Sequence, residues 1–156
     1  MFPFKLHRQT LQHAPMNGVN GNCQQTVIAC LLNKEIDEVP HFAEGLDFSQ
    51  AKESGETFNQ RIADYLATLN LQEFLLAYEG MSLKDVLKTT SGQNPKVPMI
   101  IGVRGSRSVN HSVIAYGGII VHDPHGPVQE DYEPLDCGHC DQYHVSILVP
   151  TQFGEV

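Results

Sequence analysis

The sequence predicts a single α+β domain over residues 1–156, with N-terminal helices packed on a C-terminal antiparallel sheet. Apolar residues recur at helical spacing in two stretches of the first half, 23–33 and 56–70. In the second half, short apolar runs alternate with turn residues, and the pair Gly117-Gly118 indicates a hairpin. Helices followed by hairpin-linked strands are typical of α+β folds.

The composition is that of a compact folded protein. The chain has 156 residues, of which 41% are hydrophobic and 18% charged, and this length is enough to bury a core without cross-links. The net charge of −8 is spread along the chain. A general affinity for nucleic acid or for an anionic membrane surface is therefore not expected.

The distribution of apolar residues bears on the location of the protein. No apolar run approaches the roughly 20 residues of a membrane span, and residues 1–5 lack the apolar core and cleavage site of a signal peptide. We therefore expect a cytoplasmic protein with no membrane partner. Because thiols stay reduced in the cytoplasm, the four cysteines are expected to be free or metal-bound rather than paired.

Two elements are expected near the N-terminus. Phe2, Phe4 and Leu6 alternate with other residues, which favours a short edge strand. A polar loop over 13–22 then leads into the helix predicted for 23–33. Its apolar positions share one face, so this helix is expected to be central in the core; they are Val27, Ile28, Leu31 and Leu32.

Three more elements are expected before the sheet begins. Apolar residues from Phe58 to Leu69 lie on one face of a predicted helix over 56–70. Residues 72–78 are apolar and aromatic and favour a strand. Ser82 is expected to cap a short helix over 83–88, with Asp85 at its third position.

The remaining strands are predicted from apolar runs between turn signals. Residues 97–103 form a run typical of a buried strand. Residues 111–116 and 119–123 are expected to pair through the turn at Gly117-Gly118, and Pro124 ends the second of them. After a polar loop of about 20 residues, 144–149 form the last predicted strand.

Cys23 is the first candidate for chemistry. It follows a glycine-punctuated loop and begins the helix predicted for 23–33, with Asn22 as expected N-cap and Gln25 as its capping-box partner. Free N–H groups and the positive end of the helix dipole favour a thiolate at this position. Cys23 is therefore a candidate nucleophile. The alternative is a small buried hydrophobic residue, which is the interpretation that we adopt for Cys30 in mid-helix.

His111 and Asp123 are candidate partners of Cys23. Pairing across Gly117-Gly118 brings His111 opposite a position next to Asp123, so both residues lie at the same end of the hairpin. A one-residue slip would reverse the face of one side chain, so spacing leaves open whether the two share a face. The alternatives are an ordinary strand histidine and, for Asp123-Pro124, a common turn start.

Three motifs in this order carry a resemblance to a known family. They are Gly21-Asn22-Cys23 at the start of an apolar helix, Asn110-His111-Ser112-Val113 on a strand, and His122-Asp123-Pro124 on the next strand. The chain resembles the papain-like cysteine peptidase superfamily, and in particular small bacterial and phage proteins similar to bacteriocin-processing cysteine peptidases. The motif-bearing positions cover about a quarter of the chain.

The resemblance implies a papain-like α+β fold and a role for each matching residue. Cys23 would be the nucleophile, His111 the general base and acid, and Asp123 the group that orients His111. The family's oxyanion donor is usually a Gln several residues before the cysteine, and this chain has Asn17 at that spacing. The implied activity is that of a cysteine hydrolase, a peptidase or amidase that acts through a thioester without a cofactor, with a peptide or amide as substrate.

Two other functions remain open at this point. An acyl transferase or transglutaminase-like transferase uses the same triad and differs only in the acceptor that attacks the thioester. A non-catalytic papain-like protein of phage or bacterial origin would keep the fold as a binding module, and the departure at Asn17 favours this alternative. The sequence does not indicate an oligomeric state.

Cys137-Gly138-His139-Cys140 is a second motif with chemical potential. A C-x-x-C pair forms half of many zinc sites, and His139 or the nearby His144 are further candidate ligands. A structural zinc site usually needs a second spaced pair, and the sequence has no second C-x-x-C. We therefore expect no metal, with Cys137, Cys140 and His139 as weak candidates in a loop.

Overall fold

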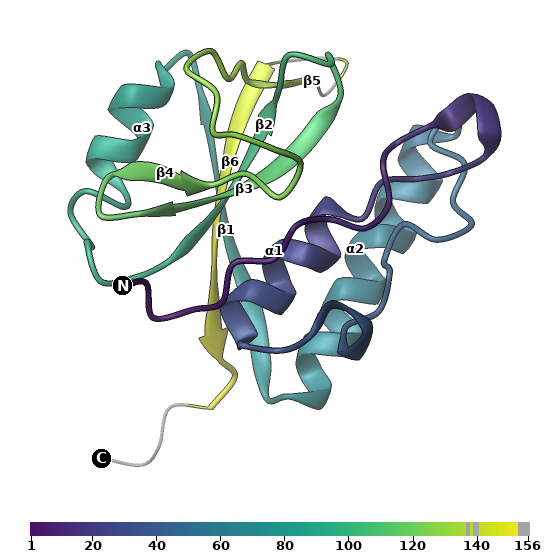
Figure 1. The fold of residues 1–156 in the computed structure, drawn as a ribbon, viewed down its shortest axis with the longest axis horizontal. Coiled ribbons are helices and arrows are strands. Elements are labelled where there is room, and N and C mark those ends of the chain that lie inside the picture. Colours follow the sequence, from purple (N-terminus) through teal and green to yellow (C-terminus); the bar gives the residue numbers. More distant parts are fainter. Residues whose placement is uncertain (137, 139–140, 153–156) are drawn as a thin grey trace.

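The described part of the protein is built around an antiparallel sheet of six strands. The computed structural model describes residues 1–136, 138 and 141–152. The strand order is β1-β6-β2-β3-β4, and β5 pairs with β6 beside this path. The strands, shown in Figure 1, are β1 (Leu71–Glu79), β2 (Met99–Arg104), β3 (Asn110–Tyr116), β4 (Ile119–His122), β5 (Leu135–Asp136) and β6 (Asp141–Pro150).

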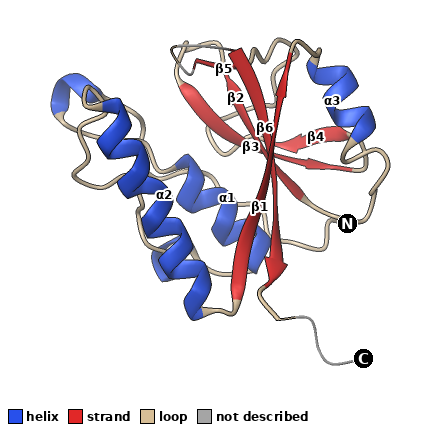
Figure 2. Cartoon of the chain, turned by 180° about the vertical axis from the view of Figure 1, so that it is seen from behind, coloured by secondary structure: helices blue, strands red, loops and turns tan. Residues whose placement is uncertain are grey.

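The α-helices cover the two faces of the sheet unequally. α1 (Cys23–Leu32) and α2 (Ala51–Thr68) lie together on one side, and α3 (Leu83–Thr89) lies on the other (Figure 2). The first side holds a core in which Val27 and Ile28 of α1 are buried in one cluster with Ile100 and Ile114 of the sheet. The second core forms around α3, from Val86 and Leu87 with buried side chains of β2, β3 and β6.

The predicted α+β class is confirmed by the three α-helices and the antiparallel sheet of the described residues. Ser82 caps α3 as expected, since its hydroxyl accepts a hydrogen bond from the N–H of Asp85 at 3.1 Å. Strand β1 follows α2 directly and pairs along its whole length with β6, so the first and last strands of the chain are neighbours. No helix in the described part of the chain has the length and apolar character that a membrane crossing requires.

Several predicted boundaries differ from the structure. α2 starts at Ala51 rather than 56: the N–H of Ser54 donates to the carbonyl of Gln50 in the first turn, and the buried Ser54 hydroxyl donates to the carbonyl of Asp47. β5 was not predicted, since a two-residue strand carries too little periodicity. Residues 2–6 form no strand. Their backbone groups are used differently: the N–H of Lys5, for example, donates to the side chain of Asn33 after α1.

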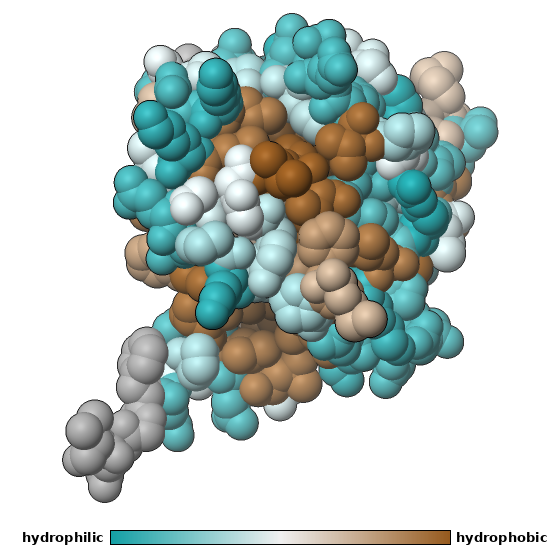
Figure 3. All heavy atoms as spheres, turned by 60° about the vertical axis from the view of Figure 1, so that its left-hand side comes forward, coloured by the Kyte–Doolittle hydropathy of each residue, from teal (hydrophilic) through white to brown (hydrophobic). Residues whose placement is uncertain are grey.

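The surface is not uniformly polar. In the space-filling view, apolar side chains gather in patches within a polar surface (Figure 3). Among the described residues, the exposed large hydrophobic side chains include three consecutive residues of β1, namely Phe74, Leu75 and Leu76. Ile119 of β4 is also exposed. β1 and β4 are the two ends of the strand order, so apolar side chains are exposed at both edges of the sheet.

The β3–β4 hairpin has a two-residue turn that requires glycine. Tyr116 pairs with Ile119, and both Gly117 and Gly118 have positive φ, at 66° and 87°. Such a turn matches the twist of antiparallel strands. A Cβ on Gly118 would also lie 3.1 Å from the Cα of Gly92, whereas one on Gly117 would meet nothing closer than 4.0 Å.

We predict that Gly118→Ala destabilises the protein more than Gly117→Ala. Gly117→Ala should lower the free energy of unfolding by about 1 kcal/mol, the cost of a left-handed residue with a Cβ. Gly118→Ala adds the close contact with Gly92, and we expect about 2–3 kcal/mol. Gly117→Asn is the control, since Asn tolerates this conformation. Urea unfolding measures all three, and equal losses at both glycines would contradict the prediction.

Candidate active site

Cys23 is the first residue of α1, as predicted, but Asn22 does not cap the helix with its side chain. The Asn22 carboxamide turns toward the N-terminal segment. Its oxygen accepts the N–H groups of Thr10 and Leu11, and its nitrogen donates to Thr10 and to the Gln25 carboxamide. The expected capping box is therefore wrong. As a consequence, no side chain caps the first turn of α1 beside Cys23.

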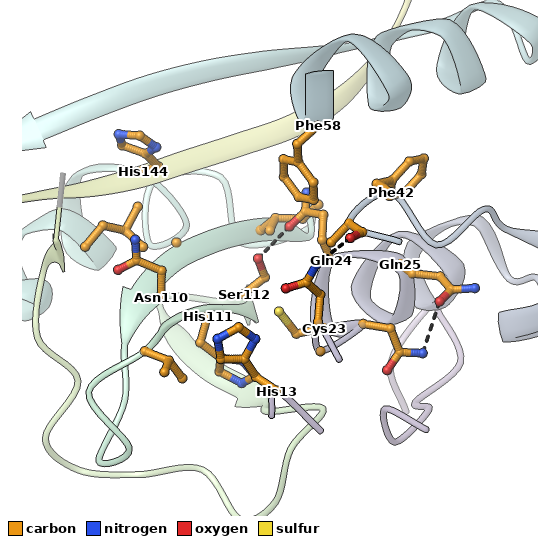
Figure 4. Close-up of a pocket in the computed structure, with 18 of the residues that line it drawn as sticks. His13, Cys23, Gln24, Gln25, Phe42, Phe58, Asn110, His111, Ser112 and His144 are labelled. Atoms are coloured by element: carbon orange, nitrogen blue, oxygen red, sulfur yellow. Dashed lines mark hydrogen bonds between the residues drawn. The ribbon is translucent and has the colours of Figure 1, made fainter. Parts of the chain in front are cut away.

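The environment of the Cys23 sulfur favours the thiolate. Burial raises the pKa of the thiol, but the hydrogen bond and charge of His111 act in the opposite direction and lower it. Hydrogen bonds from the backbone of Ser112 and Gln24 lower it further, and the pKa lies below the ordinary value of a cysteine. Figure 4 shows the sulfur beside the imidazole of His111.

A β-bulge decides that His111 and Asp123 lie on one face of the hairpin. Near the turn Ala115 pairs with Ile120, but the next pair is Ile114 with His122, so Val121 is an extra residue. Because paired residues share a face and successive residues alternate, this one-residue shift moves Asp123 to the face of His111. Without the bulge, the carboxylate would lie on the opposite side of the sheet.

His111 and Asp123 form a buried ion pair. The Nε2 atom of His111 lies 2.7 Å from Oδ1 of Asp123, and the two side chains are 4% and 1% exposed. Burial lowers the pKa of His111, but the hydrogen bonds and charges of Asp123 and Cys23 outweigh it and raise that pKa from 6.5 to about 9. The imidazole is therefore charged at neutral pH, and its Nδ1 edge remains for the thiolate.

Asp123 has further donors that the sequence interpretation missed. The Tyr132 hydroxyl donates to Oδ2 at 2.7 Å, and the N–H of His125 donates to Oδ1 at 2.8 Å. Burial raises the pKa of Asp123, but the bond and charge of His111, followed by these two donors, lower it to about 2. No pattern in the sequence indicates that Tyr132, nine residues after Asp123, donates a hydrogen bond to this carboxylate.

The N-terminal segment holds the loop that carries Asp123. The Arg8 guanidinium donates to the carbonyls of Asp123 and Gly126, and the N–H of Gln9 donates to the carbonyl of Pro124 at 2.9 Å. The same segment reaches α1 through Asn22. It therefore connects the helix that carries the nucleophile with the loop that carries the carboxylate.

The site opens into a cavity of about 490 Å³. Cys23, at the start of α1, and His111, on β3, both lie on the wall of this cavity (Figure 4). One wall is aromatic and comes from the segment between α1 and α2 and from α2 itself; its residues are Phe42, Phe48 and Phe58. A cavity of this volume is within the range typical of small-molecule sites.

Gln24 and Ser112 form a second connection between α1 and β3. The Ser112 hydroxyl donates to the Gln24 carboxamide oxygen, shown as a dashed line in Figure 4. Gln24 follows Cys23 and Ser112 follows His111, so this bond joins the residues next to the sulfur and the imidazole. Both residues line the cavity. Their position suits them to fix the separation of the thiolate and the imidazole.

The structure thus brings together Cys23, His111 and Asp123, but not Asn17. Asn17 ends a short 3₁₀ turn (Pro15–Asn17), is exposed and does not line the cavity. Cys30 is buried in mid-helix. The weak metal candidates Cys137, His139 and Cys140 lie outside the described residues. Within the described part of the chain, no three His, Cys, Asp or Glu side chains are grouped as metal ligands would be.

Comparison of the chain with models of protein families, with curated proteins and with solved structures found no match. The functional interpretation therefore depends on the geometry and chemistry of the site.

We predict that Tyr132→Phe destabilises the protein at neutral pH but much less in acid. Asp123 has a folded-state pKa of about 2, below the ordinary 3.8, so its stabilising contribution is present above pH 3.8 and is lost as the pH falls toward 2. Removing the Tyr132 hydroxyl raises the folded-state pKa and shrinks this contribution. We expect a loss of about 1.5–3 kcal/mol at pH 7, typical of a hydrogen bond to a charged group.

The control for this measurement is Tyr143→Phe. The Tyr143 hydroxyl donates to the neutral carbonyl of Tyr132, so its loss should cost about 1 kcal/mol at either pH. Urea unfolding across the acid range compares the two variants. A cost of Tyr132→Phe that does not change with pH would contradict the role of Tyr132 at the carboxylate.

We predict that the Gln24–Ser112 bond tunes the reactivity of Cys23. Ser112→Ala should slow the alkylation of Cys23 at pH 6 by about 10-fold, because the sulfur and the imidazole lose their fixed separation. Ser112→Thr keeps the hydroxyl and should restore the rate. Gln24→Met should match Ser112→Ala, and the double variant should be no slower than either single variant. Additive effects in the double variant would show that the two side chains act separately.

Proposed function

We propose that the protein is a papain-like cysteine hydrolase that cleaves a peptide or another amide through a thioester. The observation that carries this proposal is the chain of contacts from Cys23 through His111 to Asp123, in which the pKa of the thiol is lowered and that of the imidazole is raised to about 9. A thiolate next to a charged imidazole is the reactive form of a cysteine nucleophile.

The residues suit each step of such a reaction. The Cys23 thiolate would attack the substrate carbonyl, and the charged His111 would give its proton to the leaving amine, which leaves an acyl group on the sulfur. Neutral His111 would then take a proton from water as the water attacks the thioester. The acid is released, and the proton on His111 restores the charged pair with the Cys23 thiolate.

The oxyanion formed in these steps needs hydrogen-bond donors. Asn17 is outside the cavity, so it does not support the role that the resemblance implies for it. The first turn of α1 has no side-chain cap, and its N–H groups point out of the helix start at Cys23. We assign the backbone N–H of Cys23 as one donor, a position where the helix dipole also favours negative charge.

The test is selective alkylation of Cys23. An unperturbed thiol is only about 0.3% thiolate at pH 6, so Cys23 should react with iodoacetamide up to about 100-fold faster than Cys30 and the other cysteines. Mass spectrometry of tryptic peptides measures the rate at each cysteine. The excess should disappear in His111→Ala, because the imidazolium that stabilises the thiolate is removed.

His125→Ala is the matched control. Its ring lies 6.3 Å from that of His111, but only its backbone N–H, which the variant keeps, contacts Asp123. Rapid alkylation should persist in this variant. Equal reactivity of all cysteines in the wild type would overturn the proposal. Incubation with peptide substrates then separates a hydrolase from a transferase, since only a transferase would favour an added amine over water as acceptor.

A further inference from the structure

β1 forms an outer edge of the sheet (Figure 2). All nine of its residues, Leu71–Glu79, pair with β6 on one side. No other strand in the described part of the chain pairs with its opposite side. The backbone N–H and C=O groups on that side are therefore available to another strand.

This edge lacks most of the features that usually prevent strand addition, and its two charged residues, Glu73 and Glu79, lie outside its apolar middle. Leu71–Glu79 contains no proline, glycine or lysine, and its pairing with β6 has no bulge. Phe74, Leu75 and Leu76 are 53%, 47% and 43% exposed. Because successive residues alternate, both faces of the strand are apolar at its middle. A long edge without a bulge and with an apolar middle favours pairing with a further strand.

We propose that β1 pairs antiparallel with β1 of a second copy of this chain, about a two-fold axis at Leu75. This register opposes Leu75 with Leu75 of the partner subunit and Phe74 with Leu76 of the partner subunit. It uses the whole length of the strand. The interface is isologous, as in most homodimers, because the same residues meet from both sides.

The register continues the apolar rows of the existing sheet. In one copy Phe74 pairs with Ile147, and Leu76 pairs with Val145. In the dimer, Phe74 would lie opposite the partner subunit's Leu76. Each cross-strand row would then contain four apolar residues, one from β1 and one from β6 of each copy. Val145 is buried in the core around α3, and Ile147 packs against that core. The dimer would therefore extend the core across the two-fold axis.

The charges of β1 agree with this axis. Glu73 lies opposite the partner subunit's Ala77, and Glu79 lies opposite the partner subunit's Leu71. Moving the axis by one residue to Leu76 would place Glu73 opposite the partner subunit's Glu79, and like charges directly opposite are unfavourable. Moving it to Phe74 would shorten the overlap. The axis at Leu75 is thus the register that combines full overlap with no opposed carboxylates.

The dimer would also bring the partner to the cavity. Glu73 and Leu75 line the cavity that contains Cys23. In the proposed register the partner subunit's Leu75 and the partner subunit's Ala77 lie next to these two residues on the same face. Each copy would then add apolar side chains beside the part of the other's cavity that β1 lines.

Sedimentation velocity on the full chain over a range of concentrations tests the association. We expect a concentration-dependent dimer for the wild type and a monomer for Leu76→Lys at the same concentrations. The matched control is Ile119→Lys on β4, the other edge strand, where the residue is 63% exposed. This variant should still dimerise. Circular dichroism confirms that each variant is folded, and Phe74→Lys replaces any Leu76→Lys protein that is not.

Cross-linking tests the register independently. Only a residue on the two-fold axis meets its own copy, so Leu75→Cys should form a disulfide-linked dimer under mild oxidation, whereas Glu79→Cys and the wild type should not. A monomeric wild type at all concentrations would overturn the proposal and leave the edge to a strand of another protein. Loss of the dimer in Ile119→Lys, or a cross-link at Glu79→Cys in place of Leu75→Cys, would overturn it as well.

Discussion

The buried carboxylate of Asp123 is the constraint on which the site depends. A charge that is 1% exposed is stable only when donors surround it. The structure supplies the imidazole of His111, the hydroxyl of Tyr132 and the N–H of His125. These donors come from β3 and from the loop after β4, so the carboxylate holds the two together. Arg8 binds the same loop through backbone carbonyls and ties it to the N-terminal segment.

The start of α1 shows how a local rule gives way to a tertiary contact. Asn22 has the right position and chemistry for an N-cap, yet its carboxamide binds the backbone of Thr10 and Leu11. This contact anchors the N-terminal segment and leaves the first turn without a side-chain cap. The helix dipole and its free N–H groups then act on Cys23. A cap on this turn would compete with the thiolate for the same donors.

The cavity and the open edge share one strand. β1 contributes Glu73 and Leu75 to the cavity and exposes its outer side along its whole length. α2 precedes β1 in the sequence and packs against it, and no other strand in the described part of the chain pairs with the outer side of β1. In this arrangement the proposed reactive site and the proposed association surface share one strand. Changes at β1 are therefore expected to affect both.

The sequence by itself determined the order of the three α-helices and the five longer strands of the described chain, the position of Cys23 at a helix start, and the placement of His111 and Asp123 at one end of a hairpin. These follow from periodicity, turn residues and spacing, which are local properties. Only the tertiary structure decided that Val121 bulges and turns Asp123 toward His111, that Asn22 binds the N-terminal segment, and that Tyr132 completes the carboxylate site. Asn17 had the spacing of an oxyanion donor but lies outside the cavity. Each of these outcomes depends on contacts between residues far apart in sequence. Hydrophobic periodicity repeats every two to four residues, so it does not predict a one-residue shift in strand register or the direction of one side chain.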